Sequence, residues 1–117
     1  MASSTQGAVR RMGKVIELRR ECLSEYKRVH ADDHPGVRDL LEAANLRNFS
    51  IFLHDVAGKL LLFLYAEYTG SDFAGDMAKL DAEPRNIAWL AQCDPMQQTL
   101  KVDGSSWSDM ECVYHNN

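Results

Sequence analysis

Residues 48–68 read NFSIFLHDVAGKLLLFLYAEY, the most apolar stretch of the chain and the one with the clearest strand pattern. Residues 48–54 and 59–68 are two runs rich in aromatic and aliphatic side chains, separated by a short segment that ends in Gly58. Such runs on either side of a short, glycine-containing turn predict a β-hairpin. The second run is apolar on both faces, because side chains alternate along a strand. One face would carry Leu60, Leu62, Leu64 and Ala66, and the other Leu61, Phe63 and Tyr65.

A strand that is apolar on both faces needs cover on both. Burying one large apolar side chain is worth about 1.5–3 kcal/mol, so leaving the second face in water would cost several kcal/mol and would favour aggregation. We infer a homodimer that packs sheet to sheet. Cover of the second face by the C-terminal residues or by an N-terminal arm is the alternative.

Two further strands are expected outside the hairpin. Residues 14–20 (KVIELRR) alternate, with Ile16 and Leu18 on one face. Near the C-terminus, residues 107–115 (WSDMECVYH) alternate in the same way. This period of two is typical of strands that pack one face on a core.

Helical spacing marks the two segments between these strands. The first begins at Leu23 and is interrupted at Pro35. The second begins near Ser71, restarts at Pro84, a residue that suits a first helical turn, and ends at Pro95. The resulting order, βαββαβ, favours an α+β fold with one antiparallel sheet and its helices on one face.

The composition is that of one soluble globular domain. The chain has 117 residues, 45% of them hydrophobic and 26% charged, which suits a single core. We expect a polar arm over residues 1–13 and one domain over residues 14–117. The net charge of −4 and the dispersed basic residues argue against nucleic acid as a partner. No apolar run is long enough for a membrane span or a secretory signal, so we expect a cytoplasmic protein with no membrane partner.

The segment 25–36 (EYKRVHADDHPG) concentrates the residues that could carry chemistry. His30 and His34 have the i, i+4 spacing of a helical metal motif. Pro35, however, disfavours the helical conformation at His34. The glutamate that follows the first histidine of zinc hydrolases is also replaced, by Ala31. We therefore expect no metal here.

Acid/base chemistry fits the segment better. Tyr26 and His30 are four residues apart with no helix breaker between them, so they lie on the same helical face. A histidine that faces the core is costly unless it has partners, and its ordinary pKa near 6.5 suits it to proton transfer at neutral pH. A phenol beside it can hold the ring or bind a hydroxyl. The alternative is a structural core histidine packed on a tyrosine.

Almost the whole chain, from about Lys14 to His115, resembles the L-rhamnose mutarotase family. The residues that carry the resemblance are the hairpin, the pattern Y-x-x-x-H-x-x-x-x-P at Tyr26, His30 and Pro35, and the pattern E-x-x-Y at Glu111 and Tyr114. The resemblance implies a ferredoxin-like, dimeric α+β barrel that interconverts the α and β anomers of a 6-deoxy sugar without metal or redox cofactor. It also implies that His30 is the proton donor and that Tyr26 binds the monosaccharide.

The sequence departs from the family at the expected sugar site. Phe49 stands where the family has a second substrate tyrosine, and His34 where it usually has a tryptophan. Asn86 and Ile87 replace an adjacent tryptophan pair, and Trp89 follows two places later. The resemblance places these five residues at the substrate. Polar and stacking groups distinguish sugars by the arrangement of their hydroxyls. Because these groups differ here, both L-rhamnose and L-fucose are candidate sugars.

Two other functions remain open at this point. Similar dimeric folds also host cofactor-free monooxygenases and haem-degrading enzymes, in which His30 would activate a quinol or bind haem, and fold alone does not separate these activities. A non-catalytic dimer that binds a metabolite is the other alternative.

Overall fold

The computed structural model describes residues 9–101 and 106–117. Its sheet has the strand order β2-β3-β1-β4, and β5 pairs with the same edge of β1 as β4. Every pairing is antiparallel. The strands are β1 (Arg10–Leu18), β2 (Leu46–Val56), β3 (Lys59–Tyr68), β4 (Gln97–Gln98) and β5 (Ser108–Met110).

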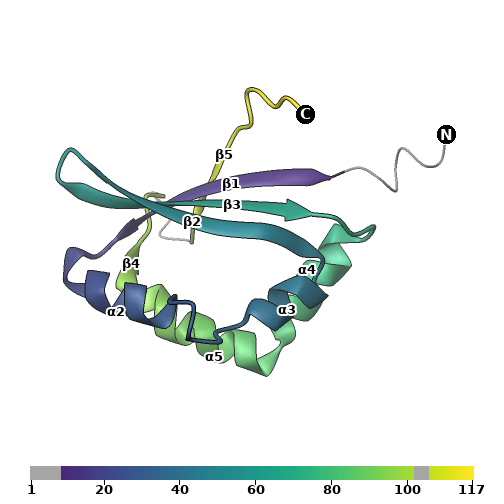
Figure 1. Cartoon of the computed structure of the whole chain (residues 1–117), viewed down its shortest axis with the longest axis horizontal. Helices are drawn as coiled ribbons and strands as arrows, with labels where there is room; N and C mark the ends of the chain where they lie inside the picture. The colour runs from purple at the N-terminus through teal and green to yellow at the C-terminus, as the bar shows by residue number, and fades with distance from the viewer. Residues whose placement is uncertain (1–8, 102–105) are drawn as a thin grey trace.

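The helices all lie on one side of this curled sheet (Figure 1), which confirms the predicted α+β, ferredoxin-like βαββαβ arrangement. No helix in the described part of the chain is both long and apolar enough to cross a bilayer. The helices are η1 (Arg20–Cys22), α2 (Leu23–Val29), α3 (Arg38–Ala43), α4 (Phe73–Ala82), α5 (Pro84–Cys93) and η2 (Asp94–Met96).

The hairpin of β2 and β3 is closed by a turn of two residues, Ala57 and Gly58. Both have positive φ, 53° and 85°, as a type I′ turn requires. Towards its other end β2 contains an irregularity between Arg47 and Ser50, where Asn48 has φ 52°. A bulge of this kind redirects the neighbouring side chains, and it brings Phe49 to the helix side of the sheet.

Burial follows the alternation predicted for β3. Leu60, Leu62, Leu64 and Ala66 are buried beneath the helices, while Leu61, Phe63 and Tyr65 on the opposite face are only half-buried. Phe52 pairs with Phe63 on that face and is 64% exposed. The second face of the sheet is therefore an incompletely covered apolar surface.

The strands at the two ends of the chain differ from their predicted bounds. β1 begins at Arg10, inside the segment expected to be a polar arm, and residues 1–8 lie outside the described part of the chain. The last strand spans only Ser108–Met110, and residues 111–117 have no regular structure. Its place beside β1 is shared with β4, which the sequence did not predict, because a pair of glutamines has no strand pattern of its own.

We expect the turn to set the stability of the hairpin. Gly58→Ala should lower the free energy of unfolding by about 1–2 kcal/mol, because the new Cβ meets no neighbour but is strained at positive φ. Ala57→Asn should raise it by about 0.5–1 kcal/mol, because asparagine tolerates this conformation. Urea unfolding followed by circular dichroism measures both. Equal effects of the two changes would contradict the turn geometry.

Candidate active site

A cavity of about 700 Å³ opens between the sheet and the helices. The sheet contributes an apolar wall that includes Ile51, Leu64 and Ala66, and the helices and the segment after α2 contribute most of the polar and aromatic side chains. Its volume falls in the range of small-molecule sites, roughly 300–1,000 Å³. Of the predicted site residues, it brings together Tyr26, His30, His34, Phe49, Asn86 and Trp89.

His30 lies at the C-terminal end of α2, where the helix leaves carbonyl groups without helical partners. Its Nδ1 is 2.7 Å from the carbonyl oxygen of Tyr26. A carbonyl only accepts, so Nδ1 carries the ring proton and, in the neutral ring, Nε2 keeps a free lone pair. Burial is the largest cause that lowers the pKa of His30 below its ordinary value, and the charge of Arg38 acts in the same direction.

Tyr26 holds the imidazole from one side. The two rings stack with centroids 4.1 Å apart and an interplanar angle of 25°. The phenol oxygen accepts a hydrogen bond from Nε2 of Gln97 at 3.3 Å. Burial raises the pKa of Tyr26 to about 12, so the phenol keeps its proton at neutral pH. The residue therefore fixes His30 and offers a neutral hydroxyl.

Arg38 holds the segment between α2 and α3 in place. Its Nη1 donates to the carbonyl of His34 at 2.5 Å, and its Nη2 donates to those of Ala31 at 3.1 Å and His30 at 3.2 Å. The same segment contains Gly36, whose φ of +54° suits a residue without a Cβ. These contacts give the loop after His30 one defined path.

Trp89, on α5, forms the second wall of the imidazole site. The ring centroid of His30 lies 5.1 Å from that of Trp89 in an edge-on arrangement, and the ring centroid of His34 lies 5.9 Å from it. An indole with two imidazoles beside it is an apolar platform bordered by polar nitrogens. Such a surface suits one face of a sugar ring, which is apolar over its C–H groups and polar at its edge.

The remaining predicted residues have different surroundings. Phe49 is 38% exposed and lines the cavity from the irregular part of β2. Asn86 is buried, and its Nδ2 donates to the carbonyl of Leu80 at 3.2 Å. Ile87 is 54% exposed and does not line the cavity. On α5, one step along the helix turns a side chain by about 100°, which separates Ile87 from Asn86.

Among the cavity residues that the sequence did not predict are Trp107 and Gln97. Trp107, just before β5, lines the cavity and packs against the core. Gln97, in β4, lines it and holds the Tyr26 hydroxyl. Trp107 could have been noticed because it is one of the chain's two tryptophans. Gln97 has no local signal, since only the pairing of β4 with β1 places it there.

The two histidines do not share a helical face, because α2 ends before His30 and His34 lies in the turn beyond it. Among residues 9–101 and 106–117, no group of three or more histidine, cysteine, aspartate or glutamate side chains is placed to hold a metal ion.

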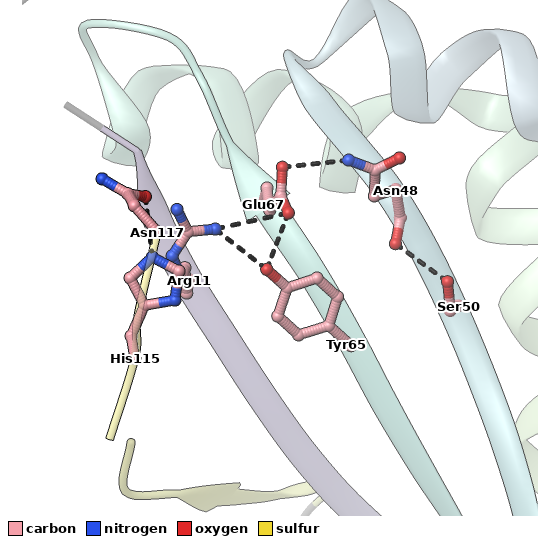
Figure 2. Close-up of polar contacts among 7 residues, drawn as sticks. All are labelled: Arg11, Asn48, Ser50, Tyr65, Glu67, His115 and Asn117. Carbon is pink, nitrogen blue, oxygen red and sulfur yellow. Dashed lines mark hydrogen bonds and ion pairs between the residues drawn. The ribbon is translucent and has the colours of Figure 1, made fainter. Parts of the chain in front are cut away.

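A separate polar cluster lies on the sheet face away from the helices (Figure 2). Glu67 is at its centre and accepts hydrogen bonds from the hydroxyl of Tyr65 at 2.7 Å, from Asn48 at 3.0 Å and from Arg11 at 3.3 Å. The hydrogen bond from Tyr65 is the largest cause that lowers the pKa of Glu67. Buried Leu64 and Ala66 alternate with these side chains along β3, so the cluster is outside the cavity.

Known proteins of one family match almost the whole chain. A family described as L-rhamnose mutarotase matches residues 11–116. The L-rhamnose mutarotase of Lactiplantibacillus plantarum is 26% identical over 105 residues, covering 90% of this chain and 96% of the relative. That of Ligilactobacillus salivarius is 27% identical over 108 residues, covering 90% and 95%.

The fold agrees with a solved structure. The crystal structure of an L-rhamnose mutarotase from Formosa agariphila aligns with a TM-score of 0.63 at 19% identity, covering 92% of this chain and 99% of that chain. At this identity the likeness concerns the fold, whereas the family match rests on sequence over residues 11–116. The chain belongs to the L-rhamnose mutarotase family.

Proposed function

We propose that the protein is a mutarotase that interconverts the α and β anomers of a 6-deoxy aldose, L-rhamnose or L-fucose, with His30 as the group that moves the proton. One observation carries the proposal: the Nδ1 of His30 is bound to a backbone carbonyl, which leaves the Nε2 lone pair of the neutral ring free beside a cavity of monosaccharide scale. Nε2 has no hydrogen-bond partner among the described residues.

The chemistry needs one proton to travel between two oxygens of the sugar. Nε2 of His30 takes the proton of the anomeric hydroxyl O1 while the C1–O5 bond breaks, its electron pair goes to O5, and O1–C1 becomes the aldehyde carbonyl. The imidazolium then gives the proton to O5. Rotation about C1–C2 and the reverse steps close the ring on the other face. No redox change occurs, and His30 returns to its neutral form.

The lowered pKa of His30 suits this sequence of steps. A base that accepts and then returns a proton works best when its pKa lies near the working pH or slightly below it. Burial keeps the ring neutral at pH 7, and the hydrogen bond to Tyr26 holds it in the tautomer that exposes the base. Positioned acid/base groups contribute about 10²- to 10⁴-fold, which is sufficient for a reaction that also proceeds unaided.

The lining of the cavity suits a 6-deoxy sugar. The methyl group at C5 needs an apolar surface, which Ile51 and Leu64 provide on the sheet side. The C–H face of the ring would stack on Trp89, and hydroxyls would meet Tyr26 and the imidazoles. Phe49 offers a ring without a hydroxyl, so one hydroxyl contact is lost there. This difference motivates testing L-fucose as well as L-rhamnose.

Anomer exchange tests the function directly. His30→Asn keeps a side-chain N–H for the Tyr26 carbonyl but removes the base, so we expect it to fold normally and to lower the catalysed rate by about 10²- to 10⁴-fold. Two-dimensional exchange NMR on equilibrated L-rhamnose and L-fucose measures the rate. Ligand-induced stabilisation with no exchange by the wild-type protein would instead indicate a binding protein.

The pH dependence follows from the lowered pKa of His30. The base must be neutral, so kcat/KM should fall as the pH drops through a midpoint below the ordinary 6.5. Arg38→Gln removes a positive charge that helps to lower the pKa of His30, so the midpoint of the pH profile should move to higher pH. Rate profiles of both proteins between pH 4 and 9 measure the shift. A midpoint that moves downward in Arg38→Gln contradicts the assignment.

We further propose that the protein is a homodimer that packs through the sheet face away from the helices. Register places Val15, Phe63 and Phe52 side by side across β1, β3 and β2 on this face. The cluster around Glu67 borders this apolar strip, because Tyr65 and Glu67 follow Phe63 on the same face of β3. Interfaces with an apolar centre and a polar rim have this arrangement.

The C-terminal residues support a second copy of this chain as the occupant. Residues 111–117 rise from β5 on the side of the sheet away from the helices (Figure 1). They carry Val113, 86% exposed, and Tyr114, 79% exposed. A segment with exposed apolar side chains beside an incompletely covered apolar face is complementary to the same face and segment of a two-fold related copy.

Sedimentation tests the dimer. The wild-type chain should sediment at twice its mass of 13.2 kDa, and Phe52→Glu should raise the dissociation constant about 30-fold or more because it places a charge at the centre of the interface. Ile87→Glu is the matched control, since Ile87 is also exposed but lies on α5. A monomeric wild-type protein, or equal effects of the two changes, would disprove the interface.

A further inference from the structure

His34 belongs to the cavity but not to the helix that positions His30. It lies in the turn after α2, where its backbone N–H donates to the carbonyl of Ala31 at 2.9 Å and its own carbonyl accepts from Arg38 at 2.5 Å. The centroid of its ring lies 5.9 Å from that of Trp89, the indole that also contacts His30. These two hydrogen bonds fix the backbone of His34, from which its imidazole reaches the cavity.

The two nitrogens of His34 have unequal surroundings. Nδ1 is the one side-chain nitrogen or oxygen among the described residues that is buried without a hydrogen-bond partner. A buried nitrogen without a partner is costly whether it donates or accepts. In the neutral ring one nitrogen is a donor and the other an acceptor, and the neutral histidine side chain intrinsically favours the proton on Nε2, so we assign a bare Nδ1 and an Nε2–H to His34. Nε2 is not buried and has no partner among the described residues.

His30 has the opposite arrangement. Its Nδ1–H is bound to the Tyr26 carbonyl, so its Nε2 is an acceptor. His34 presents an Nε2–H donor. The cavity thus holds an acceptor and a donor beside one indole. A pyranose needs this combination at C1, because the anomeric hydroxyl donates, whereas the ring oxygen only accepts.

Three other side-chain donors that line the cavity, those of Arg38, Lys14 and Asn86, already have partners. The guanidinium of Arg38 donates to backbone carbonyls, and Lys14 forms an ion pair with Asp109 at 2.5 Å. Nδ2 of Asn86 donates to the carbonyl of Leu80. His34 differs from these three residues in having a side-chain donor with no partner of its own.

We propose that His34 donates a hydrogen bond from Nε2 to the ring oxygen O5 of the bound sugar while His30 takes the proton of the anomeric hydroxyl. This assignment rests on the mutarotase function proposed above. As the C1–O5 bond breaks, O5 gains the electron pair, and the His34 N–H stabilises the charge that develops there. His34 keeps its proton throughout, because the proton that finally reaches O5 comes from the His30 imidazolium.

Two nearly isosteric variants test the role. His34→Gln keeps a side-chain N–H donor at about the distance of Nε2, and His34→Met removes it. Because charge develops on O5 only during ring opening, His34→Met should lower kcat about 100-fold with a much smaller change in KM, whereas His34→Gln should recover a large part of kcat. Both rates come from exchange NMR with L-rhamnose and L-fucose.

Thermal unfolding of the two variants is the control for folding. Equal stability with unequal kcat supports a donor, because loss of packing would affect both variants alike. Equal kcat in His34→Met and His34→Gln, or a kcat in His34→Met equal to that of the wild-type protein, overturns the assignment and leaves the mutarotase function standing. Absence of exchange in the wild-type protein overturns the function itself and, with it, the role of His34.

Discussion

The hydrogen bond between Nδ1 of His30 and the Tyr26 carbonyl is the interaction on which the site depends. It ends α2, because the side chain occupies a carbonyl that the helix leaves without a partner. It also decides which nitrogen carries the ring proton, and so gives the imidazole its direction. The same contact is therefore a helix cap and the basis of the proposed chemistry. His30 therefore contributes both to the end of the helix and to the proposed proton transfer.

Hydrogen bonds from two arginines position the loop after α2, which also lines the cavity. Arg38 binds the carbonyls that follow the helix, and Arg85 forms two hydrogen bonds with Asp39, at 2.8 and 2.9 Å, and one with the carbonyl of Gly36 at 3.1 Å. Both arginines are exposed, so salt screens the electrostatic part of these interactions. The several hydrogen bonds made by each guanidinium still define the position of the loop. The loop and α5 are thereby joined, and Trp89 on α5 stands beside both imidazoles.

The sheet separates two kinds of surface. Its helix side provides the wall of the cavity, and its other side presents the apolar strip and the polar cluster around Glu67. β3 is apolar on both faces, and its odd and even positions face opposite sides of the sheet. It therefore contributes both to the wall of the cavity and to the apolar strip. The stability of the site and the proposed association of two chains thus depend on the same hairpin.

The hairpin, the helix that restarts at Pro84, and the proximity of Tyr26 and His30 could be predicted from the sequence, because each follows from local spacing or from a residue with restricted φ. The alternation of apolar side chains on the two faces of β3 was predicted for the same reason, whereas the structure shows which face meets the helices. The contacts between elements were needed to establish that Ile87 is exposed outside the cavity, that Trp107 and Gln97 line it, and that the last strand ends at Met110. Those outcomes depend on which elements meet across the sheet, and periodicity along one element holds no information about its neighbours.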